Sequence, residues 1–385
     1  MPKIAERIQN VQDPVIPIVG KLIGQSPGTI SLGQGIVHYD PPKAAVDAIR
    51  HASESVHRYG DVCGTDGLLT AIRSKVQDEN GIPLDGMAAI YTAGSNMAFL
   101  NAILAIADVG DEIILLSPFY FNHDMAIEIA GCKTVAVPTT DDYQIDIDAI
   151  GAAITPRTRA IVTVSPNNPT GVIYPRESLM AVNELCRSHD IYHISDEAYE
   201  YFVYSGAEHF SPASLPGAAQ HTISLYTLSK AYGMAGWRAG YMVVPSSLVM
   251  PIKKVQDTNL VCPPMLNQLA AQSAIETGRK WVAPKVEALE EVRSAVLGEL
   301  ADIPGCRIPD PDGAFYMLLK LETHWDDMDL VKYLIREHHV AVLPGETFGM
   351  RDQCSIRISY GALEANSVVA GAQRLRTGLQ QALSQ

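Results

Sequence analysis

Short apolar segments alternate with longer amphipathic segments through the middle of the chain. Short runs rich in β-branched residues, bounded by Gly, Pro or Ser, favour buried strands, whereas apolar positions three or four residues apart favour helices. The pattern predicts strands at 88–92, 112–116, 133–137, 160–164, 192–195, 222–226 and 239–244. It predicts helices at 44–57, 66–79, 96–107, 122–130, 147–154 and 176–189. This order indicates an α/β fold with a mostly parallel central sheet and helices on both of its faces.

The pattern changes after Pro264, where the expected helices become longer. Helices are expected at 265–277, 282–300, 330–338 and 364–383, and strands at 314–321, 340–343 and 355–360. This part indicates a smaller α+β domain, and the Pro- and Gly-rich opening predicts an extended arm with one helix that packs against it. We therefore divide the chain into an N-terminal arm that is part of the small domain (1–45), a large domain (46–285) and a small C-terminal domain (286–385).

Composition narrows the possible partners and location. The 385 residues are 47% hydrophobic and 19% charged, and the net charge of −14 argues against a nucleic-acid or anionic-membrane partner. The six cysteines contain no C-x-x-C pair, which is typical of reduced thiols in a cytoplasmic protein and indicates no metal site. The first residues lack the apolar segment of a signal peptide, and no apolar run reaches membrane-spanning length.

Five polar side chains follow the expected strands in an order that indicates one chemistry. They are an amide, a carboxylate, a phenol, an amine and a guanidinium, at Asn168, Asp196, Tyr199, Lys230 and Arg238. Open α/β sheets bind ligands at the carboxyl ends of their strands, so we expect these groups to meet there. Pyridoxal 5'-phosphate requires such a set: a lysine that bonds to its aldehyde, a carboxylate for its pyridine nitrogen and an arginine for its phosphate.

The roles of these residues follow from their chemistry. Lys230 must be an uncharged amine to attack an aldehyde, and burial together with Arg238 would lower its pKa. Tyr199, three residues after Asp196, would lie on the same face of a helical turn and hydrogen-bond the cofactor phenolate oxygen together with Asn168. On its own, each residue also fits an ordinary surface, capping or packing role.

A Gly-Ser-Asn sequence at Gly94, Ser95 and Asn96 opens an expected helix directly after a strand. The free backbone N–H groups and the helix dipole at such a position favour an anion such as the phosphate. The side chains of Thr227 and Arg238 would add donors. Tyr120 would stack on the pyridine ring, although a core aromatic fits its position about equally well.

Arg357 lies between two serines in the alternating strand Ser355–Tyr360. Alternation places Arg357 on the face opposite Ile356 and Ile358, where a guanidinium can bind a carboxylate through two hydrogen bonds. A surface salt bridge is the alternative.

Taken together, these residues resemble the class I/II aminotransferases, which are pyridoxal-phosphate enzymes of fold type I. The resemblance covers nearly the whole chain and is closest to the plant-type aromatic/methionine aminotransferases of the ISS/VAS group. The matching segments are Gly33–Tyr39, Ser117–Asn122, Tyr199–Tyr204 and Ser229–Arg238. Kynurenine/glutamine transaminases share the Gly-Gln-Gly sequence of the first segment, and bacterial aspartate aminotransferases share much of the core between residues 165 and 230.

The resemblance implies further roles. Lys230, Asp196 and Tyr199 would be the catalytic residues, and Gly35, Asn168 and Arg357 would bind the substrate. Tyr59 would reach the phosphate of a neighbouring subunit, which implies a homodimer with shared active sites. The arm would be a mobile lid, and the Asn168–Pro169 peptide would be cis.

The expected reaction moves the amino group of an L-amino acid to a 2-oxo acid by a ping-pong mechanism. Asn96 stands where dicarboxylate enzymes of this group carry a lysine, so aromatic, methionine or similar neutral donors are favoured over aspartate or glutamate. Ile36, Tyr39 and Tyr120 are expected in the donor pocket.

Other functions remain as alternatives. These are an aspartate/glutamate-type aminotransferase and, on the same fold, a carbon–sulfur β-lyase or an ACC-synthase-like lyase. A regulator with an N-terminal helix-turn-helix would need more residues before Gly33, and a nucleotide-dependent dehydrogenase would need a G-x-G-x-x-G sequence after a strand.

Overall fold

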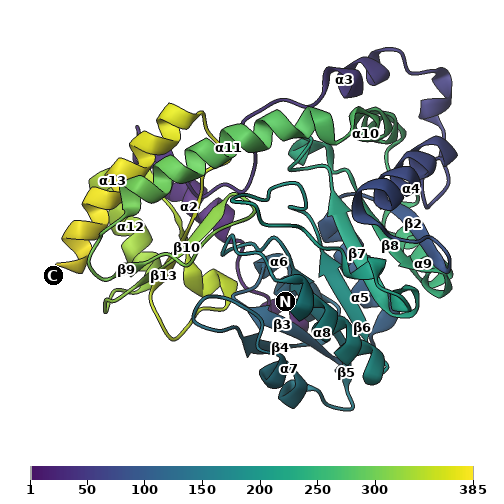
Figure 1. The fold of residues 1–385 in the computed structure, drawn as a ribbon, viewed down its shortest axis with the longest axis horizontal. Helices are drawn as coiled ribbons and strands as arrows, with labels where there is room; N and C mark the ends of the chain where they lie inside the picture. Colours follow the sequence, from purple (N-terminus) through teal and green to yellow (C-terminus); the bar gives the residue numbers. More distant parts are fainter. Residues whose placement is uncertain (1, 385) are drawn as a thin grey trace.

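The computed structural model describes residues 2–384 and is built around a seven-stranded sheet with the order β2-β8-β7-β6-β5-β3-β4 (Figure 1). The strands are β2 Met87–Thr92, β3 Glu112–Ser117, β4 Lys133–Pro138, β5 Thr158–Val164, β6 Tyr192–Asp196, β7 Thr222–Thr227 and β8 Gly240–Pro245. Strand β8 runs antiparallel to both of its neighbours, and the other described pairings in this sheet are parallel. The expected α/β fold with a mostly parallel sheet is confirmed.

Alternate residues of the buried strands face two separate cores. In β3, Ile113 and Leu115 belong to the larger core with Phe99 of α5, whereas Ile114 and Leu116 belong to a second core with Leu179 of α8. Both faces of the sheet are therefore covered, as the near-continuous apolar strands predicted. The helices of this part are α3 Lys43–Arg50, α4 Asp66–Asn80, α5 Ser95–Ile106, α6 Phe121–Ile129, α7 Ile147–Ala153, α8 Arg176–Ser188, α9 Val249–Leu260 and α10 Met265–Thr277.

The C-terminal part forms a smaller antiparallel sheet with the order β12-β13-β10-β9. Its strands are β9 Cys306–Arg307, β10 Tyr316–Leu321, β12 Leu343–Pro344 and β13 Ser355–Ser359. The accompanying helices are α11 Arg279–Leu300, α12 Asp327–His338 and α13 Ala365–Leu383. Figure 1 shows α11 running from the large sheet toward α13. The division at residues 45 and 285 stays a proposal.

The N-terminal segment is attached to this smaller part. Its elements are α1 Glu6–Asn10, α2 Val15–Gly24 and β1 Ile30–Ser31. Strand β1 pairs in parallel with β11 Val340–Ala341, so backbone hydrogen bonds join this segment to the C-terminal part. The segment holds two helices where the sequence predicted one.

Three further expectations differ in detail. The expected helix 44–57 is divided into α3 and a 3-10 turn at Glu54–His57. The expected strand 340–343 is divided between β11 and β12, which belong to different sheets. Helix α9 was not predicted, because one of its two buried residues is the polar Gln256, whose amide donates to the backbone carbonyls of Val62 and Tyr91.

The described cysteines are all free thiols. Among the described helices, none combines the length and the apolar character needed to cross a bilayer.

Candidate active site

A cavity of about 350 Å³, called the edge cavity here, lies at the carboxyl ends of the parallel strands. Five loops meet at this edge because β2, β3, β5, β6 and β7 all end there, and the antiparallel β8 begins there. The lining residues are Ser95, Asn96, Tyr120, Val164, Asn168, Asp196, Ala198, Tyr199, Thr227, Ser229, Lys230 and Arg238. The structure thus brings together nine of the predicted site residues, and it adds Val164, Ala198 and Ser229.

One end of the edge cavity is shaped by glycines. Gly94 has a φ of +87°, and a Cβ added there would lie 2.6 Å from Nη2 of Arg238. A Cβ on Gly240, which pairs with Thr92 and Thr227, would lie 2.7 Å from the Cα of Gly94. Because α5 begins at Ser95, its free N–H groups lie beside this guanidinium, as a phosphate-sized anion requires.

Hydroxyl groups lie beside the same end. Thr227 donates from Oγ1 to Oγ of Ser229 at 2.9 Å, and both residues line the cavity. Arg238 has a φ of +53° and donates from Nη1 to the carbonyl of Ala235 at 2.8 Å. Ser229 was missed in the sequence because a serine beside a lysine in a polar turn carries no signal of its own.

The amine of Lys230 faces the cavity in an electropositive setting. It donates from Nζ to the carbonyl oxygen of Gly35. Burial, followed by the charges of Arg357 and Arg238, lowers the pKa of Lys230 to about 8, and Asp196 opposes this shift. A sizeable fraction of this amine is therefore neutral near physiological pH, which is unusual for lysine.

Asp196 is buried at the end of β6. Its Oδ2 accepts from Nε2 of His123 at 3.0 Å, and its Oδ1 accepts from the backbone N–H of Ala198 at 3.1 Å. His123 stacks on Phe99 with ring centroids 4.0 Å apart. His123 was not predicted as a site residue, because a histidine on an apolar helix face looks like a packed core residue.

Tyr199 and Asn168 connect the edge cavity to the smaller, C-terminal sheet. The hydroxyl of Tyr199 lies 2.8 Å from that of Tyr316 on β10. The Tyr199 hydroxyl also accepts from Nδ2 of Asn168 at 3.4 Å. Burial raises the pKa of Tyr199, so the phenol stays neutral. The Asn168–Pro169 peptide is cis, as the resemblance implied.

Arg357 on β13 is a buried cation, and its hydrogen bonds to the described residues are all to neutral groups. Its side chain donates to Oδ1 of Asn168 at 3.1 Å and to the carbonyl of Gly33 at 2.6 Å, and it lies over the rings of Tyr316 and Phe348. Its Nε has no hydrogen-bond partner among the described residues, and the residue is 2% exposed. The alternative of a surface salt bridge is therefore wrong, and the arrangement suits an incoming carboxylate.

A second cavity of about 350 Å³, called the side-chain cavity here, adjoins the first. The two share Tyr120, Asn168, Tyr199 and Lys230. The other lining residues are Pro14, Ile16, Gln34, Gly35, Ile36, Phe121, Asn122, Tyr316 and Arg357. The described cations that line it are Lys230 and Arg357.

Three predicted aromatic residues lie in different surroundings. Tyr120 lines both cavities, and its hydroxyl donates to Oδ1 of Asn96 at 3.3 Å. Tyr39 lies behind the lysine, where its hydroxyl donates to the backbone carbonyl of Lys230 at 3.2 Å, so it does not form a pocket wall. Tyr59 is 84% exposed in the single chain and is outside the residues that line either cavity.

Comparisons with known proteins agree with this geometry. Residues 27–375 match the family model for aminotransferase class I and II. The chain is 30% identical to the aromatic aminotransferase ISS1 of Arabidopsis thaliana, over 99% of this chain and 97% of that protein. It is 35% identical to a probable aspartate/prephenate aminotransferase of Thermus aquaticus, over 88% of each chain.

A solved structure is similar along almost the whole chain. The aspartate aminotransferase of Thermus thermophilus with maleate superposes with a TM-score of 0.88 at 30% identity, covering 98% of this chain and 100% of that one. The resemblance drawn from the sequence is thereby confirmed. With a partly buried lysine of lowered pKa, a buried aspartate and a buried arginine at one sheet edge, the chain belongs to the class I and II aminotransferases, enzymes that transfer amino groups.

Proposed function

We propose that the protein is a pyridoxal-phosphate-dependent aminotransferase that prefers donors with neutral side chains. Aromatic amino acids, methionine and similar L-amino acids would donate, and a 2-oxo acid would accept. The observation that carries this proposal is the position of the Lys230 amine, between a cavity that holds Asp196 and a cavity that holds Arg357.

The edge cavity fits this cofactor. The cradle at Gly94 and Arg238, with the Ser95, Thr227 and Ser229 donors, matches a phosphate. At the end of β6, the buried Asp196 matches a protonated ring nitrogen, and its hydrogen bond from His123 fixes its orientation. When bound, pyridoxal phosphate supplies an aldehyde that captures the amino group and a ring that accepts the electron pair released at Cα.

The chain's own residues would orient the donor and move its proton. Arg357 and Asn168 would hold the α-carboxylate, which turns the Cα–H bond toward Lys230. The neutral Lys230 amine would then take the proton from Cα as a general base and afterwards give it back as a general acid. Tyr199 and Asn168 would hydrogen-bond the phenolate oxygen and fix the cofactor against Tyr120.

The side-chain cavity supports the proposed preference for amino donors with neutral side chains. Its walls include Ile16, Ile36 and Phe121, and its two described cations already serve the reacting centre. The second carboxylate of aspartate would lie there without a partner, and an unpaired buried charge is strongly unfavourable. The Thermus aquaticus relative named above favours aspartate as a second candidate. Membership of this family favours amino-group transfer over the lyase alternatives.

The first test is an absorbance spectrum of the purified protein before and after addition of amino acids without any 2-oxo acid. The expected result is a cofactor band that shifts to that of pyridoxamine phosphate. Lys230→Ala is the matched variant, and it should bind the cofactor non-covalently yet show no turnover. Wild-type transamination by Lys230→Ala would exclude the proposed role of this lysine. Pyruvate and ammonia formed without an acceptor would instead indicate a lyase.

The donor preference is tested separately. We expect a higher kcat/KM for methionine or phenylalanine than for aspartate, and Asn96→Lys should raise the aspartate value. A strong aspartate preference in the wild-type protein would contradict the neutral-donor part and leave amino-group transfer intact.

A further inference from the structure

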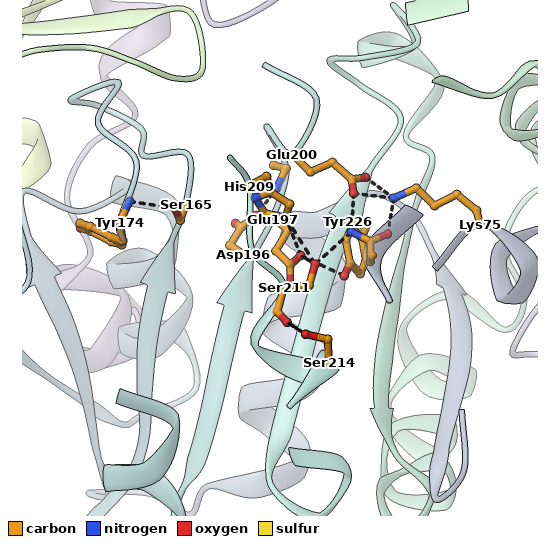
Figure 2. A network of polar contacts seen from close by, with 12 residues as sticks. Lys75, Ser165, Tyr174, Asp196, Glu197, Glu200, His209, Ser211, Ser214 and Tyr226 are labelled. Carbon is orange, nitrogen blue, oxygen red and sulfur yellow. Dashed lines mark hydrogen bonds and ion pairs between the residues drawn. The ribbon is translucent and has the colours of Figure 1, made fainter. Parts of the chain in front are cut away.

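The turn that follows β6 presents functional groups on two opposite sides. Asp196 and Tyr199 line the edge cavity. Glu197 and Glu200, which are 1% and 8% exposed, line neither cavity and are buried on the other side of the turn. Figure 2 shows Glu197 and Glu200 within a network of polar contacts that includes Ser211 and Lys75, with Asp196 drawn beside it.

Glu197 is attached to the strand and loop beside it. Its Oε2 accepts from Nε2 of His209 at 2.9 Å, from the hydroxyl of Tyr226 at 3.0 Å, and from the hydroxyl of Ser211. Although burial opposes ionisation, the hydrogen bonds from His209 and Ser211 hold the pKa of Glu197 below its ordinary value. The carboxylate is therefore charged and is fixed by three converging donors (Figure 2).

Glu200 is attached to helix α4. It accepts from Nζ of Lys75, which is itself 7% exposed, and from Nδ2 of Asn80 at 2.7 Å. The same amide of Asn80 donates to Oγ of Ser211 at 3.0 Å. Asn80 and Ser211 together connect the two carboxylates, so Glu197 and Glu200 belong to one anchoring network.

The turn has little regular structure of its own. The residues after Asp196 form neither helix nor strand. The backbone N–H of Glu197 bonds to the carbonyl of Leu225 on β7 at 2.9 Å, but the backbone N–H of Glu200 bonds only within the turn, to the carbonyl of Glu197 at 3.1 Å. Burying a charged pair costs much of what its attraction returns, so such a pair is better explained by fixing geometry than by stability alone. Since both glutamates flank Tyr199 in sequence, a shift of either one would move the cavity-facing side chains as well.

We propose that Glu197 and Glu200 are positioning residues, which hold the turn so that Asp196 and Tyr199 keep their places in the edge cavity. This inference rests on the proposed function. It deepens that function by adding residues that contact neither cavity yet set the rate of the reaction.

The test compares Glu197→Gln, Glu200→Gln and the milder Ser211→Ala with the wild-type protein. Three quantities are measured: the Kd of pyridoxal phosphate for the apoprotein, the limiting rate and apparent donor Kd of the half-reaction, and the Tm. A misplacement near 1 Å lowers rates by up to about 100-fold. We expect limiting rates lowered about 10-fold to 100-fold by the glutamate variants, with weaker cofactor binding. The apparent donor Kd, which Arg357 sets, should stay within about threefold.

Glu112→Gln is the matched control. Glu112 is 7% exposed and accepts from Arg157 and Thr155, but it lies at the start of β3, the opposite end of the sheet from the cavity. It should lower the Tm and leave the limiting rate and the cofactor Kd unchanged.

Wild-type limiting rates and cofactor affinity in both glutamate variants would overturn the proposal. So would a loss of limiting rate or cofactor affinity in Glu112→Gln as large as that in the two glutamate variants, at a similar fall in Tm. Should Glu200→Gln fail to fold because Lys75 loses its partner, Glu197→Gln and Ser211→Ala decide the question. A wild-type protein that binds the cofactor without transaminating would refute the proposed function. The cofactor Kd values of the variants would then still test whether Glu197 and Glu200 hold the turn in place.

Discussion

The residues around Lys230 create a site with more positive than negative charge. Lys230, Arg238 and Arg357 meet near one buried carboxylate, Asp196, whose charge is already engaged by His123. Burial lowers the pKa of Arg357, which reflects the cost of an uncompensated guanidinium. A phosphate and an α-carboxylate would relieve that cost, so the site is matched in charge to a dianionic cofactor and a substrate anion.

The same charges predict a pH dependence of cofactor capture. Only the neutral amine attacks an aldehyde, and the pKa of Lys230 is about 8. The rate at which the apoprotein bonds to pyridoxal phosphate should therefore rise nearly tenfold per pH unit below this value and level off above it. Stopped-flow absorbance at constant ionic strength measures this rate.

A charge variant gives the direction of the effect. Because the positive charge of Arg357 lowers the pKa of Lys230, Arg357→Gln should move the midpoint of the profile to higher pH. A profile that is flat below pH 8, or one whose midpoint stays in place in Arg357→Gln, would contradict this account of the lysine.

At the level of elements, the sequence predicted best what depends on apolar periodicity. The β-branched run of β5 and the amphipathic α8 were found at nearly the observed bounds. Asn168, Asp196 and Lys230 follow or end β5, β6 and β7. Because these strands end at the same edge of the sheet, the sequence was enough to predict that the three side chains meet. What escaped prediction is polar and buried: His123 against Asp196, Gln256 in α9, and Glu197 behind the site. Their partners are distant in sequence, so a local pattern contains no trace of them.

The turn between β2 and α5, where Gly94 lies, yields a prediction about the phosphate end of the edge cavity. An alanine at Gly94 would strain a backbone with φ of +87° and would place its Cβ 2.6 Å from Arg238. Gly94→Ala should therefore displace the guanidinium and weaken binding of pyridoxal phosphate by about 10-fold to 100-fold, a loss typical of removing a charge-assisted contact. Fluorescence titration of the apoprotein measures this Kd.

Gly110→Ala separates backbone strain from the effect on the site. Gly110 has a φ of +89° with open space where its Cβ would lie, and it precedes β3 at the far end of the sheet. Both variants should lose stability by about 1–3 kcal/mol, since both strain the backbone. Only Gly94→Ala should lose cofactor affinity, and equal weakening in the two variants would argue against the proposed phosphate cradle.

On the scale of the whole molecule, the site is assembled from segments far apart in the chain. The N-terminal segment pairs with β11 and contributes Pro14 and Ile16 to the side-chain cavity, while β13 contributes Arg357. Tyr59, by contrast, extends from the single chain with 84% of its surface exposed. Such exposure of a large aromatic side chain suits a residue that completes its environment in a second subunit.

We propose that the protein is a homodimer in which Tyr59 of each subunit contacts the phosphate of the other, and mixed dimers test this arrangement. Tyr59→Phe should weaken cofactor binding, and Lys230→Ala should be inactive. When the two variants are mixed and allowed to exchange subunits, each mixed dimer would contain one complete site, formed by Lys230 of one subunit and Tyr59 of the other. About half of the dimers would be mixed, so activity should recover to about a quarter of the wild-type value at limiting cofactor.

The alternative arrangement gives a different result in the same experiment. If Tyr59 served the site of its own subunit, no mixed dimer would hold a complete site, and activity would stay at the average of the two separate variants. Subunit exchange is controlled with a mixture of Tyr59→Phe and wild-type protein in which one partner carries a tag. Size-exclusion chromatography of this mixture reports the fraction of mixed dimers directly. Recovery above the average, in proportion to that fraction, is the outcome that the exposed position of Tyr59 predicts.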